Sequence, residues 1–188
     1  MQRLKTIIAV ALLANFFSLN SSSAADISAG QDKAGACLGC HGTKGKSTNA
    51  QWPNLAAQQT NYLISQLNAF KSGNRTNPMM NSITANLNDD DIANLAAYFS
   101  SLPRVSAGGD ANLAKLGQPK AAMCLGCHGA SAEGNGQFPR LAGQYPDYLA
   151  KQLISFKEGS RKNGTMQAIA GNLSAEEIQQ LAAYFGSL

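Results

Sequence analysis

Apolar side chains recur along much of this chain with the period of an α-helix. Four segments show the i, i+3, i+4, i+7 pattern, complete or in part, that places side chains on one helical face. They are the stripes Leu63, Leu67, Phe70; Ile92, Leu95, Ala96, Phe99; Leu149, Leu153, Phe156; and Ile178, Leu181, Ala182, Phe185. No convincing alternation of apolar and polar residues marks a strand. The sequence therefore predicts an all-α fold.

Polar residues mark where two of these helices begin. Ser174 followed by Glu177 is a capping-box signature, and Asn88 followed by Asp91 is a looser version of it. The acidic triplet Asp89-Asp90-Asp91 suits the positive end of a helix dipole. We therefore interpret it as a helix start and not as an acidic docking patch.

The helical stripes belong to an internal repeat. Residues 73–102 align without gaps to residues 159–188 at an offset of 86, and ACLGCHG matches MCLGCHG at an offset of 87. WPNLAAQ and FPRLAGQ align at 86 again, so one residue was gained or lost in the loop between. The chain is a tandem duplication of a unit of about 80 residues.

The N-terminus has the features of a secretory signal peptide. Two basic residues precede an apolar run that ends at Leu19, and small residues follow up to Ala25. A membrane anchor is the alternative, but the run is broken by Asn15 and is shorter than the roughly 20 residues of a span. The predicted organisation is a cleaved signal peptide (1–25), domain 1 (26–102), a linker containing Pro and Gly (103–113) and domain 2 (114–188). We expect an exported, periplasmic protein.

Charge and size add two constraints. The formal net charge of +4 falls to about +2 without the signal peptide, and no basic stripe with interleaved aromatic residues occurs. We therefore expect no nucleic-acid binding. A domain of about 80 residues buries only a modest core. Something large and apolar is expected to complete each core.

All four cysteines and both histidines fall in two CLGCH motifs, Cys37 to His41 and Cys124 to His128. C-x-x-C-H is the attachment signature of c-type haem. Thiols three residues apart on one helical turn can each add to a vinyl group of the same porphyrin, and the next residue presents its imidazole to the iron. The motifs therefore predict two covalently attached haems through Cys37, Cys40, Cys124 and Cys127, with His41 and His128 as iron ligands. These haems would supply the missing apolar cores.

Three other uses of the cysteines fit less well. A thioredoxin-like redox motif lies in a βαβ pattern, which this sequence lacks. Paired motifs that hold zinc are usually about 15–20 residues apart, whereas the gap from Cys40 to Cys124 is far longer. Structural disulfides would give the following histidine no role.

Methionine is the remaining candidate for the sixth iron ligand, because no spare His or Cys exists. The second repeat has one Met after its motif, Met166, and the gapless alignment places it opposite Met80. Met79 aligns with Thr165, so threonine can do whatever Met79 does. Met123 precedes Cys124 on the proximal helix and is excluded.

The surroundings of these methionines favour iron ligation over packing in the core, which is the commoner fate of a Met. NPMM and NGTM are rich in turn-forming residues. We expect each to form a loop that crosses the distal face of the haem. Met80 and Met166 are the predicted ligands.

From Asp26 to Leu188 the sequence resembles the dihaem cytochrome c4 family, which is built of two class I cytochrome c domains. The resemblance rests on CLGCH, the WPNLA and FPRLA segments, the YL…QL..F and G.R…M patterns, and LAAYF.SL. It implies two tandem domains, each wrapped around a haem with His and Met ligands. It also implies that the carbonyls of Pro53 and Pro139 accept from Nδ1 of His41 and His128. From the residues alone, each proline could equally be a loop kink.

Two pairs of repeated side chains have open roles. Arg75 and Arg161 stand five residues before each methionine. They could pair with haem propionates, to which a guanidinium is well suited, or be solvated. Tyr62 and Tyr148 repeat as well, and are expected to pack against the porphyrin with the hydroxyl on a polar partner.

The expected function is single-electron transfer in the periplasm, with no bond made or broken in a substrate. The resemblance implies shuttling between a quinol-oxidising cytochrome complex and a haem–copper terminal oxidase, with any membrane association occurring through these partners. The alternative is a haem subunit of a larger oxidoreductase, such as a sulfide-oxidising flavocytochrome. A dihaem peroxidase is disfavoured, because it needs an openable distal site with a supporting histidine and this chain has no third His.

Overall fold

The computed structural model describes residues 24–188, and nearly all of the predicted signal peptide lies outside them. The described chain is helical, and an isolated bridge between Asn135 and Phe138 is its only extended pairing. The helices are α1 (Ile27–Lys33), α2 (Gly35–His41), α3 (Thr60–Lys71), α4 (Pro78–Thr84), α5 (Asp89–Ser101), α6 (Ala111–Gly117), α7 (Ala122–His128), α8 (Pro146–Lys157), α9 (Gly164–Gly171) and α10 (Ala175–Ser187), with short 3-10 helices at Thr43–Gly45 and Gln118–Lys120. The predicted all-α class is confirmed.

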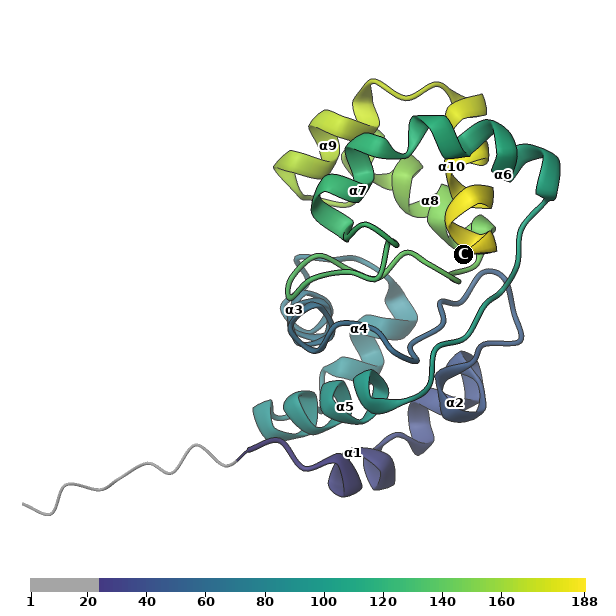
Figure 1. Cartoon of the computed structure of the whole chain (residues 1–188). Helices are drawn as coiled ribbons and strands as arrows, with labels where there is room; N and C mark the ends of the chain where they lie inside the picture. The colour runs from purple at the N-terminus through teal and green to yellow at the C-terminus, as the bar shows by residue number, and fades with distance from the viewer. Residues whose placement is uncertain (1–23) are drawn as a thin grey trace, which may run out of the picture.

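The helices form two stacked halves, with α1 to α5 in the first and α6 to α10 in the second (Figure 1). The connection from α5 to α6 is extended and runs along one side of the molecule (Figure 1). Helix α6 begins at Ala111, inside the segment predicted as linker. Among residues 24–188, no helix has both the length and the apolar character needed to cross a bilayer.

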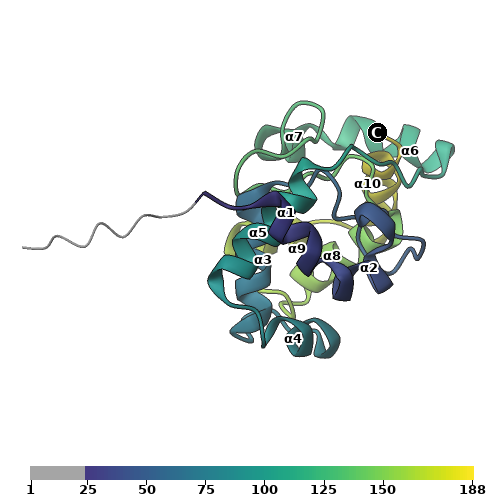
Figure 2. The ribbon, with the colours of Figure 1, turned by 90° about the horizontal axis from the view of Figure 1, so that it is seen from below.

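Each half is organised by the same crossing of two helices. In the first half α1 lies against α5, as Figures 1 and 2 both show, and in the second α6 lies against α10. A Cβ at Gly30 would lie 2.0 Å from the carbonyl oxygen of Asn94, and one at Gly117 would lie 2.1 Å from that of Gln180. Both crossings therefore require glycine, because any side chain would push the helices apart.

The predicted helix starts are confirmed. Asn88 and Ser174 each accept a hydrogen bond from the third helical residue, whose carboxylate accepts from the cap in return. These reciprocal bonds satisfy backbone donors that the first turn of a helix leaves without partners. Helices α5 and α10 therefore begin at the same position of the repeat.

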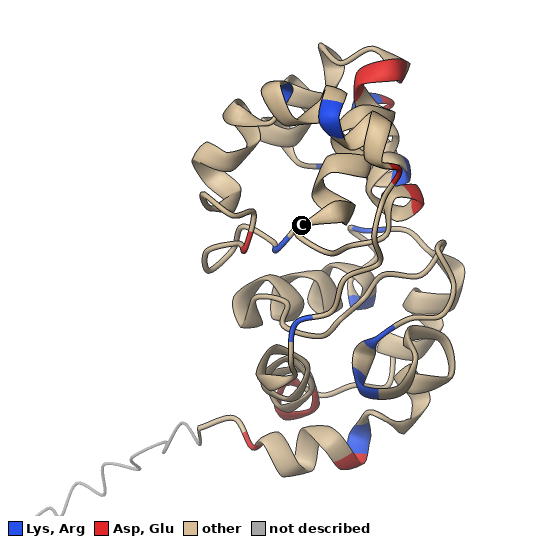
Figure 3. Cartoon of the chain, turned by 45° about the vertical axis from the view of Figure 1, so that its right-hand side comes forward, with Lys and Arg blue, Asp and Glu red and all other residues tan. Residues whose placement is uncertain are grey.

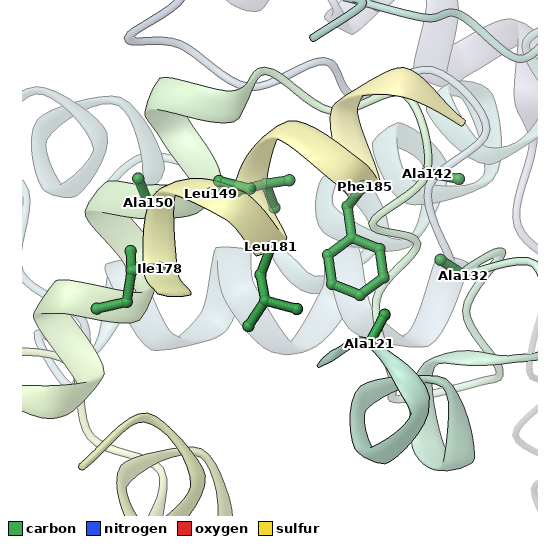
Figure 4. Packing of buried hydrophobic residues seen from close by; sticks show 9 residues of the cluster. Ala121, Ala132, Ala142, Leu149, Ala150, Ile178, Leu181 and Phe185 are labelled. Carbon is green, nitrogen blue, oxygen red and sulfur yellow. The ribbon is translucent and has the colours of Figure 1, made fainter. Parts of the chain in front are cut away.

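Two separate hydrophobic clusters fill the two halves. Most residues of the predicted stripes belong to these clusters or pack against them: Leu63, Leu67, Ile92, Leu95, Ala96 and Phe99 in the first, and Leu149, Leu153, Ile178, Leu181, Ala182 and Phe185 in the second. Phe70 and Phe156 are buried outside both clusters. Figure 4 shows the second cluster, in which side chains of α10 meet those of α8 and of the loops. Each half has its own core, as a duplicated domain should.

Polar side chains join the two halves, and they come from equivalent positions of the repeat. Gln58 of the first half binds the backbone of Arg140 in the second. Gln144, at the equivalent position of the second half, binds the backbone of Asn54 in the first. The contact therefore has an approximate twofold symmetry, like the isologous interface of a homodimer.

Candidate functional site

The two CLGCH motifs lie on short helices with the same geometry. Cys37 and Cys40 lie on α2, which ends at His41, and Cys124 and Cys127 lie on α7, which ends at His128. The four thiols are free. The motifs therefore do not form disulfides, and both thiols of each motif lie on one helical turn.

Each histidine is held by one proline carbonyl. Nδ1 of His41 lies 2.9 Å from the oxygen of Pro53, and Nδ1 of His128 lies 2.9 Å from the oxygen of Pro139. A carbonyl only accepts, so Nδ1 carries the hydrogen and Nε2 keeps its lone pair. Burial lowers the pKa of both imidazoles, against the opposing effect of the carbonyl. Each ring is therefore prepared to bind a metal through Nε2, and the predicted proline contacts are confirmed.

The two predicted methionine ligands occupy equivalent positions, but not in loops. Met80 is in the first turn of α4 and Met166 in the first turn of α9, so the predicted distal loops were wrong. The side chains of Asn77 and Asn163 accept from the backbone N–H of Met80 and Met166, at 3.0 Å in both. The Asn that suggested a turn is a helix cap, which fixes the backbone of each methionine.

Met79 differs from Met80 in its surroundings. The Met79 side chain is 51% exposed, and its sulfur lies 3.9 Å from Sγ of Cys40. Met80 is more buried, as Met166 is. Met79 therefore lies at the rim of the first motif, where the second domain has Thr165.

A continuous cavity of about 990 Å³ brings the predicted residues together. Its lining includes all eight of them, together with apolar side chains from the helical stripes of both halves: Cys37, Cys40, His41, Met80, Cys124, Cys127, His128 and Met166. In each half, free thiols, an imidazole with an available Nε2, a thioether and apolar walls thus line the same space. These residues fit a large planar apolar group that carries a metal.

Zinc fits the described residues poorly. Nowhere between residues 24 and 188 do three or more His, Cys, Asp or Glu side chains gather into a possible metal site. A structural zinc site needs four such ligands. The geometry therefore supports haem attachment, and not zinc binding, as the use of the cysteines.

Arg75 and Arg161 lie in the contact between the halves, and each stacks on a phenylalanine ring at 4.5 Å. Arg75 donates to Tyr148 at 3.0 Å, and Arg161 donates to Tyr62 at 2.9 Å. Both also donate to the side-chain oxygens of Gln66 and Gln152, at 2.8 Å in all four bonds. The described residues give neither arginine an ion pair with a carboxylate. Sequence reasoning left these arginines open and missed the two glutamines.

Comparisons with known proteins agree with this arrangement. Residues 27–103 match the family model described as cytochrome c, and residues 112–185 match cytochrome c oxidase, cbb3-type, subunit III. Cytochrome c4 of Pseudomonas aeruginosa is 39% identical over 181 residues, which cover 88% of this chain and 90% of that protein. The chain belongs to the cytochrome c4 family.

A solved structure in the family extends the likeness to three dimensions. The reduced recombinant cytochrome c4 of Pseudomonas stutzeri matches with a TM-score of 0.81 and 36% identity, and the match covers 88% of this chain and 100% of that one. A relative described as a thiosulfate dehydrogenase electron acceptor, from Stutzerimonas stutzeri, is 36% identical over 170 residues, covering 81% of this chain and 79% of the relative.

Membership of the cytochrome c4 family settles the class of chemistry. The chain has two cytochrome c domains with covalently attached haem c and iron, and it is an electron-transfer protein, not an enzyme. Bound haem supplies a reversible one-electron iron couple. The protein's own residues hold the group, orient its ligands and keep water away.

Proposed function

We propose that His41 with Met80, and His128 with Met166, would bind the irons of two haems attached through Cys37 with Cys40 and Cys124 with Cys127. The observation that carries this assignment is the matched geometry of the two halves. In each, Nδ1 of the histidine is bonded to a carbonyl, which leaves Nε2 for iron, and a capped first helical turn holds one methionine at the same cavity.

This ligation suits a carrier of single electrons. A thioether and an imidazole as the two protein ligands would favour ferrous iron and raise the reduction potential. With one His and one Met holding each iron, no open coordination site would remain for O₂ or peroxide. Two haems in one chain also allow transfer between them.

The arginines are proposed to bind the haem propionates. Two guanidinium groups share the same glutamine acceptors, border the cavity and lack a carboxylate partner among the described residues. Propionates near these guanidinium groups would supply the missing negative charge. The position between the domains favours this role over a solvated one.

We propose a periplasmic location after cleavage of residues 1–25, with domains at 26–102 and 114–188. The proposed partners are a quinol-oxidising cytochrome complex as donor and a haem–copper terminal oxidase as acceptor. Charges of both signs are scattered along both domains in Figure 3, which fits docking with little electrostatic steering. Exposed apolar side chains near the motifs, Met79, Met123 and Phe138, suit docking by apolar contact.

A second donor is favoured by a specific finding. A relative similar over most of this chain is described as the electron acceptor of a thiosulfate dehydrogenase. The same carrier chemistry would serve that donor.

A comparison of the two donors would test the function. The oxidised protein is mixed separately with a quinol-oxidising complex and its quinol, and with thiosulfate dehydrogenase and thiosulfate, while haem reduction is followed by absorbance. Rapid reduction of both haems in the first mixture supports the proposal, and reduction only in the second supports the alternative donor. Peroxide turnover far above that of mitochondrial-type cytochromes would contradict a carrier role altogether.

A further inference from the structure

One peptide group of the first domain links its histidine to the second domain. The carbonyl of Pro53 accepts from Nδ1 of His41 at 2.9 Å. The N–H of the same peptide group, which belongs to Asn54, donates to Oε1 of Gln144 at 2.7 Å. The imidazole, the peptide and the amide of Gln144 therefore form one chain of hydrogen bonds across the domain contact.

The second domain has the same chain in the opposite direction. The carbonyl of Pro139 accepts from Nδ1 of His128 at 2.9 Å. The N–H of Arg140, in the same peptide group, donates to Oε1 of Gln58 at 2.7 Å. Each histidine is thus supported by a glutamine of the other domain.

Both glutamines are fixed in this orientation. Nε2 of Gln144 donates to the carbonyl of Asn54 at 2.9 Å, and Nε2 of Gln58 donates to that of Arg140 at 3.0 Å. The two glutamines are only 5% and 7% exposed. Since nitrogen faces a carbonyl in both, the amide oxygen is the atom that must face the backbone N–H.

Serial hydrogen bonds polarise one another, more so away from water. An acceptor on the N–H of a peptide makes its carbonyl oxygen more negative, which strengthens the bond to Nδ1–H of the histidine. A stronger bond at Nδ1 makes the imidazole a better electron donor to the metal, which favours ferric iron.

We propose that Gln144 and Gln58 are positioning residues that act across the domain contact. Gln144 lowers the reduction potential of the haem bound through His41, and Gln58 lowers the reduction potential of the haem bound through His128. This inference rests on the proposed histidine ligation. It makes the domain contact part of how each potential is set.

The test is to replace each glutamine and measure both potentials in the holoprotein. Gln144→Met removes the acceptor from Asn54, and is expected to raise the potential of the first-domain haem and leave the second unchanged. Gln58→Met is expected to raise the potential of the second-domain haem and leave the first unchanged. The two haems are told apart by the hyperfine-shifted methyl signals of Met80 and Met166, assigned with Met166→Ala.

Two further variants separate this effect from damage to the interface. Gln59→Met is the matched control, because Gln59 donates across the same contact to the carbonyl of Glu133 at 2.9 Å, and the peptide group of that carbonyl binds only the backbone of His128 and no imidazole ring. It should shift neither potential. Gln144→Asn, one methylene shorter, withdraws the oxygen with less disruption and decides the question if Gln144→Met does not fold.

Amide hydrogen exchange gives a readout that does not depend on the potentials. In the reduced Gln144→Met protein, the Asn54 amide should exchange faster, while the Arg140 amide keeps its protection. Gln58→Met should reverse this pattern.

The proposal is supported if each variant raises the potential of the haem in the other domain and speeds exchange of the amide that its glutamine accepted from. It is overturned if each variant shifts the haem of its own domain, shifts both haems alike, or shifts neither while the control behaves as wild type. Failure of the ligand assignment would look different, because the methionine methyl signals would then be missing from the wild-type protein.

Discussion

The two domains share the proposed haem-binding residues but differ at the rim of the cavity. The first has Trp52, half-buried, and Met79 beside Cys40, whereas the second has Phe138, 45% exposed and 6.2 Å from the ring of His128, and Thr165. Duplication has kept the residues proposed to hold the haems and has let the residues at the rim change. Residues that repeat in both domains therefore indicate the chemistry, and residues that differ are candidates for setting the two potentials and docking surfaces apart.

The methionines should give the largest contrast. Met80→Ala and Met166→Ala should each remove about half of the weak near-infrared sulfur-to-iron band and lower the potential of one haem, because a thioether ligand raises it. Met79→Thr copies the second domain and should leave the band intact. An unchanged spectrum in Met166→Ala would show the ligand assignment of the second domain to be wrong.

The two half-buried arginines should behave as an equivalent pair. Arg75→Met and Arg161→Met each leave one half-buried tyrosine oxygen without its arginine donor and remove one of the two donors to each glutamine, which should cost about 1–3 kcal/mol of unfolding free energy. Because both arginines bind Gln66 and Gln152, the double variant should not be additive.

Denaturant unfolding of the holoproteins measures both effects. Lys115→Met on the exposed face of α6 is the control and should change little. Strict additivity of the two arginine substitutions would mean that the cluster does not act as one network.

One backbone position should respond in opposite ways in the two domains. Ala57 and Gly143 are equivalent in the repeat, with φ of 56° and 74°. A Cβ at Gly143 would lie 2.2 Å from the carbonyl oxygen of Val105 in the linker. Gly143→Ala should therefore cost at least about 1–2 kcal/mol, while Ala57→Gly should be neutral or slightly stabilising, because a left-handed alanine is strained.

Thermal unfolding of both variants is the measurement. Equal destabilisation by the two changes would show that the linker does not pack on the second domain as the structure has it.

The helix caps should give the smallest effects. Asn88→Ala and Ser174→Ala should each cost about 0.5–2 kcal/mol. A hydrogen bond from Lys33 lowers the pKa of Asp91, and backbone hydrogen bonding at Ser174 lowers that of Glu177. Both carboxylates therefore contribute stability that is present above their ordinary pKa and lost as the pH falls through the lowered values.

Denaturant unfolding at pH 7 and at acid pH would measure this. The gap in stability between each cap variant and wild type should narrow in acid. A gap that stays constant would mean that the carboxylate plays no part in the box.

Most of the fold could be predicted from the sequence, and so could the eight side chains that the structure brings together at the cavity. The stripes at Ile92 and Ile178 gave the helices, because long amphipathic periods are hard to mistake, and the repeat singled out Met80. The helical start at Asn77 was missed, because α4 is only seven residues long and Asn with Pro also describes a turn.

The domain contact could not be predicted in the same way. Gln58 and Gln144 repeat visibly, but their partners lie 82 and 90 residues away and are set by how the halves pack. A repeated polar residue in a duplicated chain is therefore a signal of a symmetric contact, although the sequence alone does not name the partner.

A redox titration of the purified protein, followed in the visible and near-infrared, tests the central claim most directly. The account predicts two one-electron steps, reduction of both haems by ascorbate without dithionite, and a sulfur-to-iron band in the oxidised protein with the intensity of two haems. A haem that resists ascorbate, or a band with the intensity of one haem or none, would contradict His and Met ligation in both domains.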